Sequence, residues 1–118
     1  MSDPAFLLVV TTVGSADDAA RLARTLVERG LAACAQISAI DSWYAWQGAV
    51  EHDAECRIVF KVASSAYEAA ERAIRELHSY ELPAIHAIAV ERAWRPYAEW
   101  VGANSAASNA EGAPKQGD

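Results

Sequence analysis

Three histidines and two cysteines are the side chains of this chain best suited to hold a metal ion. The histidines are His52, His78 and His86, and the cysteines are Cys34 and Cys56. None of them forms the i, i+4 pair, the CxxC pair or the close spacing with a carboxylate that is typical of a metal site. Both cysteines lie in apolar or strand-like sequence, where a free cysteine usually serves as a small buried hydrophobe. Spacing alone therefore predicts no metal centre.

A second candidate site combines a cation, a carboxylate and two aromatic rings. Lys61 interrupts the apolar end of a strand-like run, and Tyr80 and Glu81 follow a predicted helix. We expect these positions to converge at one end of a sheet and, with Trp46 from an adjacent subunit, to line a ligand-binding cleft. An intersubunit salt bridge with ordinary packing accounts for the same residues equally well.

His78 ends the same predicted helix. A protonated imidazole there interacts favourably with the negative end of the helix dipole, which is one explanation of its position. The other is contact with a ligand, since imidazole suits Cu(II), Ni(II) or Zn(II) and symmetry-related copies could share one ion.

Catalytic patterns are missing from the sequence. It has no nucleophile with a neighbouring base, no phosphate-binding glycine loop and no carboxylate pair placed for acid–base work, so we predict no enzyme. Lys61, Glu81 and His78 could in principle move protons. A small cofactor-free enzyme that uses them therefore stays open as the alternative.

Composition restricts the classes of protein to which this chain can belong. The chain has 118 residues, 53% hydrophobic and 22% charged, which suits one domain with a real core. Its net charge is -6, with 16 acidic and 10 basic residues, so nucleic acids and anionic membranes are unfavourable partners. RNA recognition through a sheet would also need several exposed aromatic and basic residues on the strands. The apolar run at residues 6–10 is too short for a signal peptide or a membrane span, so we expect a cytoplasmic protein.

The periodicity of apolar residues predicts an α+β fold of the order βαββαβ. The expected elements are a strand at 6–13, a helix from Ser15 to Gly30, a hairpin of two long strands at 31–46 and 49–62, a helix that begins with a Ser65–Glu68 capping box, a strand at 84–90, and a short C-terminal helix opened by Arg95-Pro96. This order is the ferredoxin-like split βαβ arrangement, with both main helices on one face of an antiparallel sheet. We assign residues 1–102 to this single domain. Residues 103–118 are small and polar, and we expect a disordered tail there.

The central hairpin is unusually long, since a typical strand has about 5–6 residues. Its end carries Trp43, Tyr44 and Trp46. Each such ring can bury ~150–250 Å², worth up to roughly 4–6 kcal/mol at about 25 cal/mol per Å². We therefore expect another copy of the chain to cover them. The alternative is a hairpin that folds back over its own sheet, and on general grounds a two-fold dimer would be the commonest assembly.

Six short segments between residues 6 and 102 follow one another in an order and at spacings that together are typical of one protein family. In chain order they are Thr11-Thr12, Leu31-Ala32-Ala33-Cys34, Trp43-Tyr44-Ala45-Trp46-Gln47-Gly48, Phe60-Lys61-Val62, His78-Ser79-Tyr80-Glu81-Leu82-Pro83 and Tyr97-Ala98-Glu99-Trp100. This ordered set resembles the CutA, or divalent-cation tolerance, family. The resemblance implies a ferredoxin-like homotrimer, similar in build to the PII signalling proteins, in which long hairpins wrap neighbouring subunits and leave clefts between them. It implies no catalytic activity and no required cofactor. Cu2+, another divalent cation or a small anion is the implied ligand.

The chain departs from the family pattern at four positions. Thr11 stands where members said to bind copper have a cysteine, and Leu77-His78 stands where they have paired histidines. Ser79 replaces the usual proline after the second helix, and Ala84 replaces an acidic residue. The thiolate, which is the softest of the implied ligands, is therefore absent from this chain. His78 is the one imidazole of that ligand set that remains.

Overall fold

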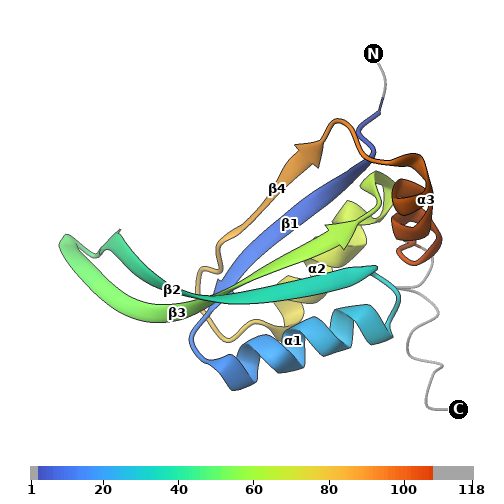
Figure 1. Cartoon of the computed structure of the whole chain (residues 1–118). Helices are drawn as coiled ribbons and strands as arrows, with labels where there is room; N and C mark the ends of the chain where they lie inside the picture. Colours follow the sequence, from blue (N-terminus) through green and yellow to red (C-terminus); the bar gives the residue numbers. More distant parts are fainter. Residues whose placement is uncertain (1–2, 108–118) are drawn as a thin grey trace, which may run out of the picture.

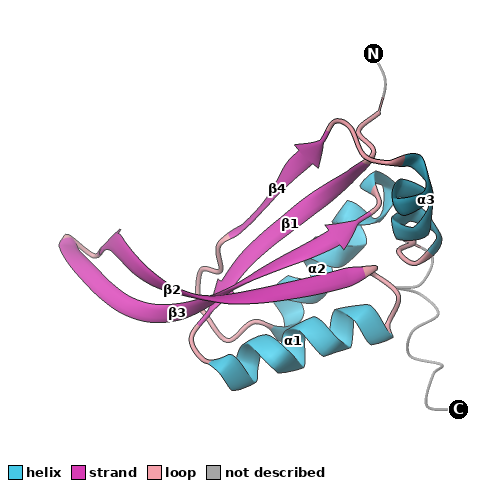
Figure 2. Cartoon of the chain, viewed as in Figure 1, coloured by secondary structure: helices cyan, strands magenta, loops and turns pink. Residues whose placement is uncertain are grey.

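The computed structural model describes residues 3–107 and has the predicted βαββαβ order (Figure 1). The elements are β1 (Phe6–Val13), α1 (Ala16–Glu28), β2 (Cys34–Trp46), β3 (Ala49–Val62), a single 3₁₀ turn η1 (Ser64–Ala66), α2 (Tyr67–Leu77), β4 (Ile85–Val90) and α3 (Arg95–Ala103). Every neighbouring pair in the sheet is antiparallel, in the spatial order β2-β3-β1-β4. Helices α1 and α2 lie on one face of this sheet (Figure 2). The predicted fold class is confirmed.

The ends of α1 follow the predicted local chemistry. The Ser15 hydroxyl caps the helix by accepting the Asp18 backbone N–H at 3.0 Å. Beyond the other end, Gly30 has a φ of 70°, which glycine adopts without the cost that a side chain would impose.

The Ser65–Glu68 capping box predicted for the second helix is wrong. The chain forms the turn η1 instead, and no side chain caps either η1 or α2. Backbone hydrogen bonds from Ala66 to the Ala63 carbonyl and from Tyr67 to the Ser64 carbonyl satisfy the first N–H groups. A cap from a side chain is therefore not needed there.

The main core lies between the sheet and the two long helices. Val9 of β1, Ile58 and Phe60 of β3, Leu26 of α1 and Ile74 of α2 are completely buried there. Inward-facing residues alternate along the last half of β3, as a strand with one covered face requires. This packing fixes the end of β1 and the end of α2, the two places from which the candidate site is built.

Helix α3 covers one end of the other sheet face. Val101 packs with Phe6 and Ala33 in a second, smaller cluster. Just past the helix, the buried Ser105 hydroxyl accepts the Ala63 N–H at 2.8 Å and donates to the Val101 carbonyl at 2.7 Å. The packed chain thus continues through Ser105, past the boundary at 102 assigned from sequence. The rest of the predicted tail, residues 108–118, lies outside the described residues.

The hairpin of β2 and β3 extends well beyond the two helices and curves as it does so (Figure 1). Its pairing is continuous from Cys34↔Lys61 to Trp46↔Ala49. Gln47 and Gly48 form the turn, both with positive φ, which matches the right-handed twist of the strands. In the single chain the far part of the hairpin stays exposed, with Trp43 at 69% and Val50 at 75%.

Candidate functional site

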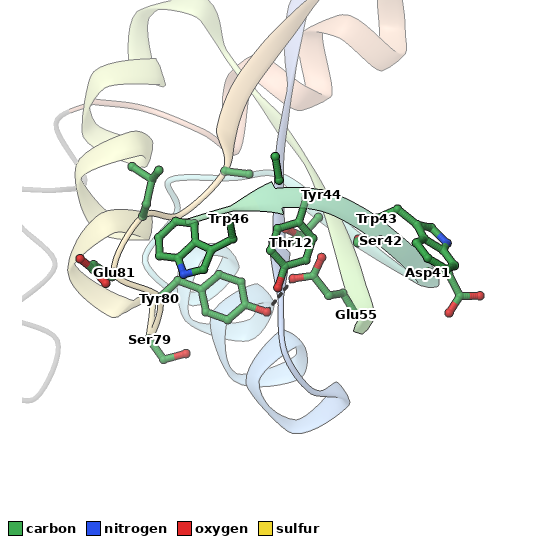
Figure 3. A pocket seen from close by; sticks show the side chains of 13 residues that line it. Thr12, Asp41, Ser42, Trp43, Tyr44, Trp46, Glu55, Ser79, Tyr80 and Glu81 are labelled. Atoms are coloured by element: carbon green, nitrogen blue, oxygen red, sulfur yellow. Dashed lines mark hydrogen bonds between the residues drawn. The ribbon is translucent and has the colours of Figure 1, made fainter. Parts of the chain in front are cut away.

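A hollow of about 810 Å³ lies where the hairpin leaves the sheet (Figure 3). Strand β2 contributes Tyr44 and Trp46, β3 contributes Glu55, and the segment after α2 contributes Tyr80 and Glu81. Three of the four residues predicted for the cleft, Trp46, Tyr80 and Glu81, therefore lie together. The sequence predicts Trp46 from an adjacent subunit, and within the single chain the curved hairpin already brings its own Trp46 to the hollow.

Tyr80 is the central side chain of the hollow. Its hydroxyl donates to the Glu55 carboxylate at 2.6 Å. Burial, followed by that hydrogen bond, raises the pKa of Tyr80, because both disfavour a second negative charge. Tyr80 also packs on Gly14, where an added Cβ would lie 3.3 Å from its hydroxyl. These contacts hold the ring at one position above the end of β1.

The hairpin side of the hollow is aromatic and acidic. Tyr44 donates a short hydrogen bond to Asp53, which is the main reason that the pKa of Tyr44 is raised to about 12. Trp43 stacks on His52 with ring centroids 4.0 Å apart, and the His52 Nε2 lies 3.4 Å from an Asp41 carboxylate oxygen. The aromatic rings are thus interleaved with carboxylates along the hairpin.

His78 ties the segment that carries Tyr80 to β1. Its Nδ1 accepts the Tyr80 backbone N–H at 3.1 Å, and its Nε2 lies 2.8 Å from the Thr12 carbonyl oxygen. Because a backbone N–H can only donate, Nδ1 is the acceptor, and Nε2 carries the proton that it donates to Thr12. Both ring nitrogens therefore have protein partners.

The residues implied for copper do not fit a metal ion. Both nitrogens of His78 are occupied, Thr11 is completely buried with no hydrogen-bond partner for its Oγ1, and Leu77 packs against the main core. Among residues 3–107, no group of three histidine, cysteine, aspartate or glutamate side chains is placed to hold an ion. A metal role for His78 would require Nδ1 to lose its hydrogen bond from the Tyr80 N–H, since a ligand nitrogen needs a free lone pair, whereas Nε2 could keep its bond to Thr12.

Lys61 lies at the other end of the sheet, which corrects the predicted convergence with Tyr80 and Glu81. It pairs with Leu8 near the start of β1, whereas Tyr80 packs on Gly14 beyond its end. Six residues of strand separate these positions by about 20 Å, at ~3.3 Å per residue. The Lys61 ammonium donates to the Tyr97 hydroxyl at 2.8 Å, a bond that raises the pKa of Lys61.

The distance between Lys61 and the segment that carries Tyr80 and Glu81 also weighs against the alternative that this protein is a small enzyme. A proton relay needs its groups within hydrogen-bond reach of one substrate. Lys61 is far from Glu81 and His78 within the chain, and it is already bonded to α3 through Tyr97. The arrangement therefore gives that alternative no support.

Sequence reasoning missed Glu55, Asp53 and Tyr44 as parts of the site. The signal for Tyr44 and Asp53 was present, because counting back from the Gln47-Gly48 turn places them diagonally across one face of the hairpin. No comparable signal existed for Glu55, because its partner Tyr80 lies on a separate element.

Comparisons with known proteins agree with this architecture. The family model described as CutA1 divalent ion tolerance protein matches residues 7–104. The divalent-cation tolerance protein CutA of Archaeoglobus fulgidus is 32% identical over 93 residues, which cover 79% of this chain and 91% of that protein. A solved structure from the same organism, named as a periplasmic divalent cation tolerance protein CutA, has a TM-score of 0.83 at 30% identity and covers 85% of this chain and 98% of its own.

The PII-like protein CutA of Nostoc sp. PCC 7120 is a further structural relative. Its TM-score is 0.81 at 32% identity, and the alignment covers 84% of this chain and 96% of that one. Because the family model spans most of the residues and the relatives match over nearly their whole length, this chain belongs to the CutA1 divalent ion tolerance family.

Proposed function

We propose that this protein works as a homotrimer without catalysis, contributes to tolerance of divalent cations, and binds a small ligand in the hollow beside Tyr80. The observation that carries the proposal is the exposure of large apolar side chains along the hairpin. Trp43 and Val50 are the most exposed of them, and these two are the side chains that another copy is proposed to cover. Covering this apolar area with another copy of the chain would stabilise the assembly, because each Å² of apolar surface removed from water contributes about 25 cal/mol of free energy.

The sheet face opposite α1 and α2 supports self-association as well. A shallow hollow of about 340 Å³ lies over it, bordered by Leu8, Val10, Val59 and Ile88. Ile88 of the edge strand β4 is 51% exposed. Together with the hairpin, this face offers apolar area for a stable interface, which usually buries about 1,200–2,000 Å² in total. Three copies are proposed because the family resemblance implies a trimer.

The cation-tolerance role follows from the names that the relatives carry, not from a metal site in this chain. Copper binding remains a prediction from the resemblance, and the bonded nitrogens of His78 speak against that residue as a preformed ligand. The cytoplasmic location is likewise a prediction. Among residues 3–107 no helix combines the length and apolar character that a membrane span requires. Separation of cell fractions would test the location.

Light scattering on the purified protein tests the assembly. We expect a particle of three times the chain mass of 12.7 kDa at micromolar concentration. Trp43→Glu should lower that mass, because it places a charge where the aromatic surface must be covered. Arg72→Glu, on the exposed side of α2, introduces the same side chain outside the apolar surfaces and should leave the mass unchanged. A wild-type monomer would refute the proposal.

A further inference from the structure

The hollow beside Tyr80 has an unusual combination of lining groups. Four aromatic side chains border it, namely those of Trp43, Tyr44, Trp46 and Tyr80, and the Glu55 carboxylate accepts the Tyr80 hydroxyl there (Figure 3). Of these, Tyr44, Trp46 and Tyr80 are each about 37–40% exposed in the single chain, so part of each of these three rings is open to a ligand. We propose that this hollow binds a small organic ammonium ion, with its charge beside Glu55 and its alkyl groups against the three rings. The inference rests on the proposed binding role and names its ligand class.

The charge of the hollow favours a cation. Its lining includes Asp41, Glu55 and Glu81 and no lysine, arginine or histidine. Asp53 adds a further negative charge next to the hollow through its bond with Tyr44. Glu55 and Asp53 are also among the causes of the raised pKa values of both Tyr44 and Tyr80. An anionic ligand, one of the classes implied by the family resemblance, would be repelled by the same charges.

The chemistry of the lining favours an organic cation over a bare metal ion. A divalent ion requires about four to eight oxygen, nitrogen or sulfur ligands, and within residues 3–107 not even three histidine, cysteine, aspartate or glutamate side chains are grouped to hold one. The Glu55 and Asp53 carboxylates already accept tyrosine hydroxyls. Aromatic faces, in contrast, attract a cation within about 6 Å of the ring centre. Alkyl groups on the nitrogen also gain apolar contact with the rings.

Two of the three rings, those of Tyr80 and Tyr44, are held in place before any ligand arrives. Tyr80 is fixed by Glu55 through its hydroxyl, by His78 through its backbone N–H, and by Gly14 against its ring. Tyr44 is fixed by Asp53. Trp46 is the last residue of β2, next to the hairpin turn. Binding therefore needs little ordering of Tyr44 and Tyr80, which lowers its entropic cost.

Calorimetric titration of the full-length protein with choline tests the inference. The neutral isostere 3,3-dimethylbutan-1-ol, which has the same shape without the charge, is the comparison ligand. We expect saturable binding of choline and at least about tenfold weaker binding of the alcohol, because only the cation gains from the carboxylates and the ring faces. Added salt should weaken binding of choline and leave that of the alcohol almost unchanged.

Two variants assign the binding to the hollow. Trp46→Ala removes one ring and should weaken choline binding about tenfold. Glu55→Gln removes the charge but keeps an oxygen that can accept from Tyr80, so it should weaken binding severalfold without loss of fold. Glu99→Gln, an exposed residue of α3, is the matched control and should bind as the wild type does. Equal binding of choline and the alcohol, or wild-type affinity in Glu55→Gln, would overturn the inference.

Light scattering on the same samples separates this inference from the proposed function. A trimer that does not bind choline would refute the ammonium ligand and leave the proposed assembly standing. A monomer that binds choline would refute the proposed assembly and leave the ammonium ligand standing. If Trp46→Ala fails to fold, Glu55→Gln together with the neutral isostere still decides the outcome.

Discussion

At the residue scale, the site depends on side chains that bond to one another more than on any single reactive group. His78 bridges two backbone positions, and Tyr80 connects the segment after α2 to the carboxylate of Glu55 on β3. The histidine that the family resemblance implies as a metal ligand is thus a positioning residue for Tyr80. Its imidazole suits this task because the two nitrogens can donate and accept at the same time.

Replacement of His78 by alanine should destabilise the protein by about 1–2 kcal/mol, because it leaves the half-buried Thr12 carbonyl and the Tyr80 N–H without these partners. The free energy of unfolding in urea at neutral pH measures the loss. Arg72→Ala, on the exposed side of α2, is the control and should cost less. Equal stability of the His78 variant and the wild type would show that the two bonds contribute nothing net.

The raised pKa values of Tyr44 and Tyr80 predict a late phase in an alkaline titration. The fold favours their neutral forms, so the stability they contribute is fully present below the ordinary tyrosine pKa of about 10 and is lost as the pH rises from there towards 12 and beyond. Absorbance of tyrosinate at alkaline pH measures the phase. Tyr80→Phe should remove part of it. Simultaneous ionisation of all four tyrosines near pH 10 would contradict the assignment.

At the element scale, α3 is attached to the domain by its own side chains and also by a contact that lies just past its end. The Ser105 hydroxyl connects the last turn of α3 to Ala63, where β3 gives way to η1. A small hydroxyl is suited to this role, because it can accept one backbone hydrogen and donate its own in a confined space. The ordered domain therefore extends past the helix that its hydrophobic pattern marks.

Ser105→Ala should cost about 1–2 kcal/mol, because the Ala63 N–H loses its acceptor in a buried place. Ser65→Ala is a matched control: the same exchange at an exposed serine that lacks the predicted capping bond should change stability by less than about 0.5 kcal/mol. Thermal unfolding of both variants gives the comparison. If Ser65→Ala destabilised the protein as much as Ser105→Ala, Ser65 would have to make a stabilising bond after all, and the absence of a capping bond at Ser65 would be refuted.

At the scale of the whole molecule, the hairpin is the element that the domain itself leaves uncovered. Helices α1 and α2 protect the sheet proper, and α3 protects one end of its other face, while the hairpin continues past all three (Figure 1). A second copy can cover this surface without any change in the fold. Stability and assembly should therefore be coupled.

The temperature of unfolding should rise with protein concentration if unfolding includes dissociation of the proposed trimer. Each tenfold increase in concentration should add about 0.9 kcal/mol per chain, a shift of a few degrees for a domain of this size. Differential scanning calorimetry over a hundredfold range of concentration measures it. Trp43→Glu should flatten the dependence. A constant midpoint for the wild type would point to a monomer that tolerates its exposed rings.

Sequence by itself determined the order of elements, the two strands of the hairpin and the start and end of α1. These features follow from periodicity and turn chemistry over a few neighbouring residues, as at Ser15, Gly30 and the Gln47-Gly48 turn. The aromatic character of the site was also visible in the sequence, through Trp46 and Tyr80.

Only the tertiary structure decided which of those residues meet. Tyr80 bonds to Glu55, Lys61 to Tyr97 and Ala63 to Ser105 across separations of 25, 36 and 42 residues. Such contacts depend on how far the hairpin curves and where each helix lies on the sheet, and no local pattern encodes either quantity. Lys61 and Tyr80 therefore lie at opposite ends of the sheet, although both are polar residues that interrupt apolar sequence.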